Sequence, residues 1–161
     1  GGGRRQSQFP NRIAIERRLS SVELGRLIGH WEGDTIIGKG HKVAAVKLVE
    51  RKSLLLCVSK LLGKSTKSTQ KAIQRRLRQM ADIVQILTPG NGKESLHHQV
   101  IAESVSAKIN FCRSVRVLVA CNTNWLIRQY FPKCRHLLML KSAEAQKIER
   151  RINHRPRKCL N

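Results

Sequence analysis

The carboxylate of Asp34 is the side chain of this sequence with the clearest potential for chemistry. It closes the run Gly29–Asp34, which reads Gly-His-Trp-Glu-Gly-Asp. Carboxylate oxygens are the ligands that Mg²⁺ prefers, and a pair of such ions activates the attacking oxygen and stabilises the leaving oxygen in phosphoryl transfer. Two ions need further carboxylates, so this chemistry depends on acids elsewhere in the chain. There are 10 acidic residues, and Asp82 is the only other aspartate.

Basic residues dominate the composition. Among 161 residues, 32 are Lys or Arg against 10 Asp or Glu, which gives a formal net charge of +22. Such an excess favours a polyanionic partner, whose binding weakens steeply as salt rises because it depends on counterion release. Aromatic residues make up only 4%, which leaves few platforms for stacking single-stranded bases. We therefore expect contact with a duplex or a phosphate backbone, and DNA is the predicted partner.

The length suits one domain with one core. Residues 1–28 are polar and basic, so we predict a flexible arm there and a folded core over residues 29–161. The five cysteines include no C-x-x-C pair, which favours free thiols in a reducing cytoplasm. No apolar run approaches the roughly 18 residues of a membrane span. The expected location is the cytoplasm, with no membrane partner.

Three short segments near the start of the core predict an antiparallel meander. Residues 31–37 and 43–49 have the composition of strands, and the two glycines within Gly38–His41 suit a hairpin turn between them. Residues 54–58 are apolar throughout, as in a central strand that is buried on both faces. Asp34 would then lie on the first strand of the sheet.

The pattern changes to a helical period over residues 66–80. Ile73, Leu77 and Met80 fall on one face of the predicted helix. Four basic residues on another face are candidates for DNA contact: Lys67, Lys71, Arg75 and Arg78. A solvated basic face is the common alternative for such a stripe.

Strands and helices alternate in the rest of the chain. The patterns predict a strand over 84–87, a helix over 96–107, a strand within 108–120, and helices over 124–130 and 144–153. The order β-β-β-α-β-α-β-α predicts an α/β fold, a mixed sheet of the ribonuclease H-like type with helices on its faces. The first and fourth strands would lie side by side. Acids after the fourth strand and on a following helix would then converge with the acid of the first strand.

Five stretches of the sequence carry a family resemblance. Residues 29–42 form the first, and four more follow in order: Leu48–Ser53, Asn91–Glu94, Asn122–Lys133 apart from Trp125, and Asn153 with Arg155–Lys158. Together they resemble the catalytic core of bacterial insertion-sequence transposases of the DDE class, in the insertion-sequence-thirty family. The chain is identified as a truncated and degenerate member, without the DNA-recognition region that precedes the core in the family.

The resemblance implies a core that cuts DNA with Mg²⁺ or Mn²⁺ and joins the freed 3′ ends to a target. Asp34 matches the family's first acid and is the implied metal ligand. Gly90 stands at the position of the second acid, and Cys121 stands at the position of the third. Glycine offers no ligand, and a thiolate is soft where Mg²⁺ requires hard oxygen. Glu94 is the only acid near enough in the sequence to be a weak substitute.

The expected function is therefore that of a transposase-derived core for DNA transposition and integration that binds DNA but has lost catalysis. The alternatives are a retained nonspecific DNA-binding or regulatory protein, an active transposase that uses a substitute acid, and a small RNA-binding basic protein. Further candidate DNA contacts lie in the last two family-like stretches: Arg128, Lys133, Arg155, Arg157 and Lys158. A solvated basic tail would equally explain the last three. A homo-oligomer is expected, as in transposases.

Overall fold

The sheet begins with the meander that the sequence predicts. The computed structural model describes residues 27–37, 44–61, 65–89, 98–109, 118–132 and 141–157. The first three strands are β1 (His30–Ile37), β2 (Ala44–Glu50) and β3 (Leu56–Lys60). Each pairs antiparallel with the next. The hairpin turn predicted over residues 38–41 lies outside the described residues.

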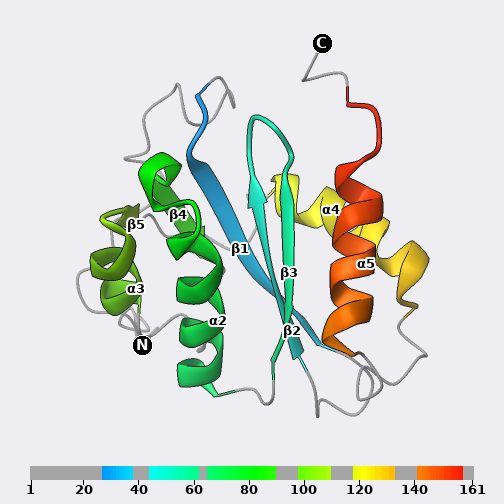
Figure 1. Cartoon of the computed structure of the whole chain (residues 1–161), viewed down its shortest axis with the longest axis horizontal. Coiled ribbons are helices and arrows are strands. Elements are labelled where there is room, and N and C mark those ends of the chain that lie inside the picture. Colours follow the sequence, from blue (N-terminus) through cyan, green and yellow to red (C-terminus); the bar gives the residue numbers. More distant parts are fainter. Residues whose placement is uncertain are drawn as a thin grey trace, which may run out of the picture.

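Two parallel strands extend the sheet on the other side of β1. β4 (Ile86–Pro89) pairs with β1, and β5 (Lys108–Ile109) pairs with β4, both in parallel. The order across the sheet is β3-β2-β1-β4-β5 (Figure 1). The prediction that the first and fourth strands are neighbours is confirmed, and so is the mixed α/β sheet.

Helices cover both faces of the sheet (Figure 1). α2 (Thr66–Arg78) and α3 (His98–Val105) lie on one face, and α4 (Leu118–Tyr130) and α5 (Ser142–Asn153) lie on the other. A 3-10 turn, η3 (Ala81–Ile83), joins α2 to β4. α4 begins at Leu118, before the predicted position 124, so the Asn-rich segment lies inside the helix and does not start it.

Each face of the sheet has its own apolar core. The first core combines strand residues with the apolar face of α2: Trp31, Val46, Leu48, Ala72, Ile73 and Leu77. The second core combines the opposite strand faces with α4 and α5: Ile36, Val49, Val58, Ile127, Ala145, Ile148 and Ile152. The apolar faces predicted for the helices after β3 and at the end of the chain are thus confirmed. Alternate residues of the strands feed the two cores, as the pleat of a sheet requires.

The Glu50 carboxylate ties the turn after β2 to the start of β1. Its Oε1 accepts hydrogen bonds from the backbone N–H groups of Gly29 at 3.1 Å and His30 at 3.4 Å. Its Oε2 accepts from the backbone N–H groups of Lys52 at 3.1 Å and Ser53 at 2.7 Å. Glu50 is 1% exposed, and a buried carboxylate needs such donors. The family-like stretches at residues 29–34 and 48–53 therefore share one buried polar anchor.

A buried ion pair and a glycine reinforce the same anchor. Arg51 pairs with Glu32, whose side chain is fully buried. Gly29 has a φ of +99°, and a Cβ at this position would stand 2.3 Å from the carbonyl oxygen of Ile83. Because only glycine accepts both conditions, the backbone carbonyl of Gly29 can approach β4 and accept the N–H of Gln85 at 2.8 Å.

β3 lies at the edge of the sheet, so the prediction of a central strand is wrong. Its faces are buried as expected, but side chains take the place of a further strand. The Asn153 amide accepts the Leu56 N–H at 2.9 Å and donates to the Leu56 carbonyl at 2.7 Å. Glu149 accepts the Val58 N–H at 2.9 Å, and Arg76 donates to the Val58 carbonyl at 3.0 Å. We call Asn153, Glu149 and Arg76 the edge clamp.

The edge clamp is braced by further contacts. Arg76 and Glu149 form an ion pair with each other. The Arg157 guanidinium donates to the Ser53 carbonyl at 2.5 Å and to Asn153 Oδ1 at 2.9 Å. Beside the clamp, the pKa of the Cys57 thiol is raised to about 11, mainly by burial, with Glu149 adding to the shift and Arg76 opposing it. The family-like stretch at the end of the chain therefore holds the edge of the sheet.

Replacing Asn153 by Ala should destabilise the fold and expose the edge of β3. Two hydrogen bonds are lost and two backbone groups lose their partners, which costs about 1–3 kcal/mol in the free energy of unfolding. An uncovered edge also pairs readily with other chains. Urea unfolding followed by circular dichroism measures the first effect, and size-exclusion chromatography measures the second.

Lys147→Ala, at an exposed position of α5, is the matched control. We expect its unfolding midpoint to stay near that of the parent protein. An Asn153→Ala protein as stable and as monodisperse as this control would contradict the role of the clamp.

Candidate functional site

Asp34 lies on β1, on the sheet face that α4 and α5 cover. Its side chain is 35% exposed. Oδ1 accepts the backbone N–H of Thr35 at 2.8 Å. Oδ2 accepts a hydrogen bond from Asn124 Nδ2 of α4 at 3.4 Å and faces the ammonium of Lys47 at 3.4 Å. The carboxylate is thus shared by a backbone amide, a side-chain amide and a lysine.

Lys47 is the site residue that sequence reasoning missed. It is directly opposite Asp34 in the register of β1 and β2, and its side chain is 0% exposed. A buried ammonium is costly unless an anion is close. The sequence did hold a signal, because Lys47 lies in the middle of an otherwise apolar strand. Counting the hairpin register outward from the Gly38–His41 turn would have paired this lysine with Asp34.

The elements that carry the other two family positions converge on Asp34. β4 runs parallel to β1, and Pro89, the last residue of β4, is opposite Gly33, the residue before Asp34. Cys121 belongs to α4, one turn before the residue whose amide contacts Asp34. Gly90 and Glu94 lie outside the described residues, as does the side chain of Cys121. The roles predicted for these three residues stay predictions.

The described residues do not fit a divalent cation at this site. Among the described residues, Asp34 supplies the carboxylate of this site, and its Oδ2 already faces an ammonium and an amide N–H. The Asn124 Oδ1 atom is buried with no hydrogen-bond partner among the described residues, which adds a single neutral oxygen. The described part of the chain holds no group of three or more His, Cys, Asp or Glu side chains suited to a metal. Mg²⁺ needs several hard oxygens in near-octahedral geometry.

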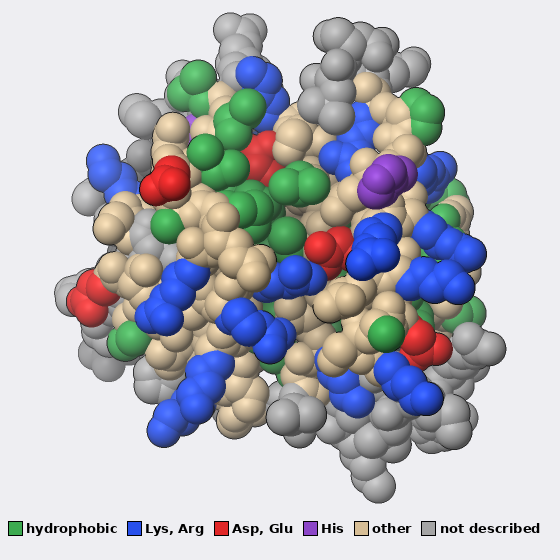
Figure 2. Space-filling view, in the orientation of Figure 1, with side chains coloured by type: hydrophobic (Ala, Val, Ile, Leu, Met, Phe, Trp, Pro, Cys, Tyr) green, Lys and Arg blue, Asp and Glu red, His purple; other side chains and the backbone are tan. Residues whose placement is uncertain are grey.

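A basic groove runs between α2 and the start of α5. It is a hollow of about 340 Å³ lined by residues of α2, β3 and α5: Lys60, Leu61, Ser68, Lys71, Ala72, Arg75 and Ser142. A second hollow of about 220 Å³ continues it and shares Lys60, Arg75 and Ser142. Figure 2 shows Lys and Arg side chains along both helices on this face. No described acid lines the groove.

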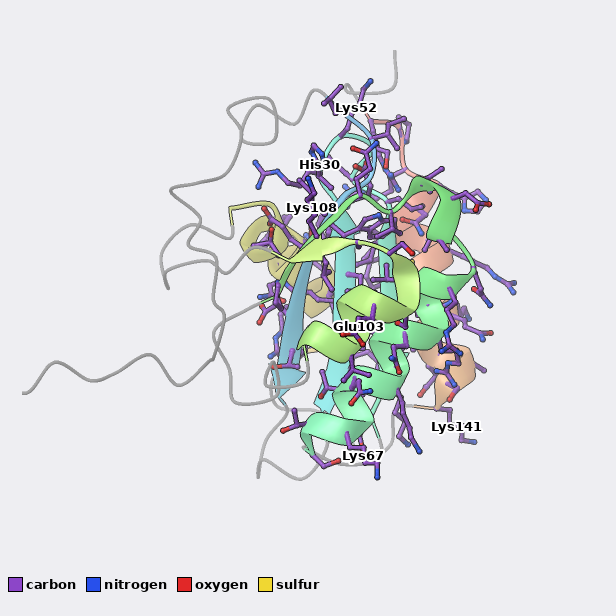
Figure 3. All side chains as sticks on the ribbon, turned by 90° about the vertical axis from the view of Figure 1, so that its left-hand side faces the viewer. His30, Lys52, Lys67, Glu103, Lys108 and Lys141 are labelled. Atoms are coloured by element: carbon purple, nitrogen blue, oxygen red, sulfur yellow. The ribbon has the colours of Figure 1, made fainter. Side chains whose placement is uncertain are left out.

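The four basic residues predicted on α2 are all exposed: Lys67, Lys71, Arg75 and Arg78. Figure 3 shows Lys67 and Lys141, near the starts of α2 and α5, at the end of the molecule opposite His30 and Lys52. The groove is therefore flanked by cations at the end where both helices begin. DNA contact by the α2 residues stays a prediction that this exposure permits.

The remaining DNA-contact candidates differ in availability. Arg155 is exposed, whereas Arg128 of α4 is half-buried. The guanidinium of Arg157 is engaged with backbone and with Asn153, which gives it a structural role. Lys133 and Lys158 lie outside the described residues. No described helix is both long and apolar enough to cross a membrane.

The fold is that of an integrase catalytic core. The chain superposes on a solved structure described as the HTLV-2 integrase catalytic core domain in complex with magnesium, in dimeric form. The TM-score is 0.60 at 20% identity, over 81% of this chain and 90% of that one. The sheet order β3-β2-β1-β4-β5 and this superposition thus assign the chain to the ribonuclease H-like fold. No family model matches the chain.

Comparison with curated proteins finds related transposases. The chain is 36% identical to the transposase of insertion sequence element IS4351 from Bacteroides fragilis, over 94% of its length. It is 34% identical to the IS1086 transposase of Cupriavidus metallidurans and 32% identical to the InsI transposase of IS30A from Escherichia coli K12, each over 99% of its length. Nearly the whole chain is therefore homologous to part of these insertion-sequence transposases. It spans 48%, 48% and 42% of the three relatives.

Replacing Asp34 by Asn should destabilise the fold, because it removes the negative charge that faces the buried Lys47 ammonium. We expect a loss of about 1–3 kcal/mol in the free energy of unfolding, less than for a fully buried pair since Asp34 is partly exposed. Urea unfolding measures it. Glu103→Gln, which removes one acid from an exposed position on α3, controls for the change in net charge. Equal stability of the two variants would mean that the pair contributes nothing.

Proposed function

We propose that this chain is a transposase-derived DNA-binding core that holds duplex DNA in the basic groove and does not cut it. The basic groove is the observation that carries the proposal. It brings Lys60, Lys71 and Arg75 to one hollow with the hydroxyls of Ser68 and Ser142. Cations and hydroxyls are the groups that proteins use to contact DNA phosphates. The kinship with transposases and the net charge of +22 support DNA as the polyanion.

The proposed binding is largely independent of DNA sequence. Contacts to phosphates fix the position of a protein on a duplex but carry no sequence information. Aromatic residues are scarce, so base stacking on single strands adds little. A duplex is thus favoured over single-stranded nucleic acid.

We propose the bacterial cytoplasm as the place of action. We also propose that the chain associates with itself, as the HTLV-2 integrase core does in its dimeric form.

Loss of cleavage follows from the donor set at Asp34. Two-metal phosphoryl transfer requires ions that bridge the attacking and leaving oxygens. One carboxylate that already faces a lysine ammonium and an amide N–H supplies few of the hard oxygens that Mg²⁺ needs, which supports the proposal. The family chemistry of DNA cleavage and strand transfer is therefore proposed as ancestral to this chain, with DNA affinity retained.

Reversing two groove charges should weaken duplex binding. We expect Lys71→Glu/Arg75→Glu to lower the affinity at least about 10-fold and to lower the slope of log affinity against log salt by about 2, since about one counterion is released per phosphate contact. Fluorescence anisotropy with a labelled 30-base-pair duplex, titrated at several salt concentrations, measures both quantities.

The matched control is Lys52→Glu/Lys108→Glu, with the same change in charge at two exposed positions that Figure 3 places away from the groove. We expect a smaller loss of affinity and a nearly unchanged slope. Equal losses in the two double variants would show that the whole charged surface binds, and no groove. Absence of duplex binding by the parent protein would overturn the proposed function.

The parent protein should not nick supercoiled plasmid DNA in Mg²⁺ or Mn²⁺. The reason is the missing set of hard oxygen ligands at Asp34. Agarose gel electrophoresis after incubation with each metal, and with a chelator as the blank, measures conversion to open circles. Metal-dependent nicking that disappears in Asp34→Asn would establish an active transposase core and a substitute acid.

A further inference from the structure

The buried position of Lys47 calls for a reason. Its side chain is 0% exposed on a strand whose neighbouring residues Val46, Leu48 and Val49 are core residues. An ammonium in such a place loses its hydration and is tolerated only where an anion compensates it. The register of the β1–β2 pair sets Lys47 directly across from Asp34, and the carboxylate and ammonium meet at 3.4 Å.

We infer that the Lys47 ammonium occupies the cation position of the Asp34 site, as a counter-ion built into the chain. The inference deepens the proposed function, because it names what stands at the ancestral metal site. A divalent ion that binds Asp34 would have to approach within about 2.0–2.1 Å of a carboxylate oxygen. It would then meet a fixed positive charge held against the same carboxylate.

The geometry of Oδ2 points the same way. This oxygen receives the Asn124 amide N–H at 3.4 Å as well as the ammonium at 3.4 Å. Oδ1 is taken by the Thr35 backbone N–H at 2.8 Å. Both oxygens therefore already face donors, and a metal would have to share the remaining lone pairs with them. Two strands and one helix supply these donors, so the arrangement belongs to the fold and does not depend on a mobile surface side chain.

The charge of Lys47 also affects any attempt to rebuild the metal site. Gly90 and Cys121 stand where the resemblance implies two acids, so restoring them as Gly90→Asp/Cys121→Glu would be the obvious route back to a metal site. With Lys47 in place, restored acids would still leave Asp34 facing the ammonium at 3.4 Å. Three changes, including the removal of Lys47, are therefore needed before Mn²⁺ binds.

Direct Mn²⁺ binding tests this inference. Free Mn²⁺ is followed by electron paramagnetic resonance in titrations of four proteins: the parent, Lys47→Met, Gly90→Asp/Cys121→Glu, and the triple variant. Met keeps most of the volume of the lysine stem without its charge. We expect tight binding only in the triple variant, about 10- to 100-fold tighter than in the acid-restored double variant. Circular dichroism verifies that each protein is folded.

The controls make each outcome decisive. Lys47→Arg in the acid-restored background retains the cation and should bind Mn²⁺ no better than the double variant. Lys47→Gln replaces Lys47→Met if the latter chain does not fold. The inference is overturned if the acid-restored double variant binds Mn²⁺ as tightly as the triple variant, or if folded triple variants with Met and with Gln both fail to bind it. Anisotropy with duplex DNA in chelator, run on the parent protein, tests the proposed DNA binding separately.

Discussion

The structure depends on compensating charges that are buried in its central sheet. Glu32, Lys47 and Glu50 are each at most 1% exposed, and all three lie on β1 or β2. Burying one such charge alone would cost several kcal/mol, a large share of the total stability of a domain. Each charge therefore fixes the position of its partner. Glu32 pairs with Arg51, Lys47 pairs with Asp34, and Glu50 accepts hydrogen bonds from the backbone at the start of β1. These pairs hold the first hairpin in one register.

The same constraint gives two of the family-like stretches a structural role. The stretch at 48–53 supplies Glu50 and Arg51, which anchor β1. The last stretch supplies Asn153 and Arg157, which hold the edge of β3. An edge strand with free backbone groups invites pairing between chains, so these side chains cover an edge that would otherwise be open to such pairing. Resemblance at such positions reports the fold more than the chemistry.

Most of the fold could be predicted from the sequence because hydrophobic period is a local signal. Strand and helix order, the pairing of the first and fourth strands and the apolar faces of α2 and α5 all follow from it. The position of β3 did not, because burial on both faces is the same for a central strand and for an edge strand closed by Asn153.

At the site, Asp34 was predicted from a motif, whereas Lys47 was not, since the partner of a buried charge is set by register across strands. α4 extends through Asn122 and Asn124, where packing of Thr123 and Ile127 outweighs weak helix propensity.

A lysine and a metal ion compensate the charge of a carboxylate in different ways. A bound Mg²⁺ exchanges with solvent and organises several oxygens, and its charge is present only when the ion is bound. An ammonium fixed by β2 is present in every molecule, makes hydrogen bonds in place of coordination, and cannot bridge an attacking and a leaving oxygen as a metal pair does. An ammonium beside Asp34 compensates the charge of the carboxylate but cannot do what a metal pair does for the reacting oxygens. Lys47 thus offsets the charge of Asp34 from within the sheet itself, whereas the cations of the basic groove remain exposed to a phosphate backbone.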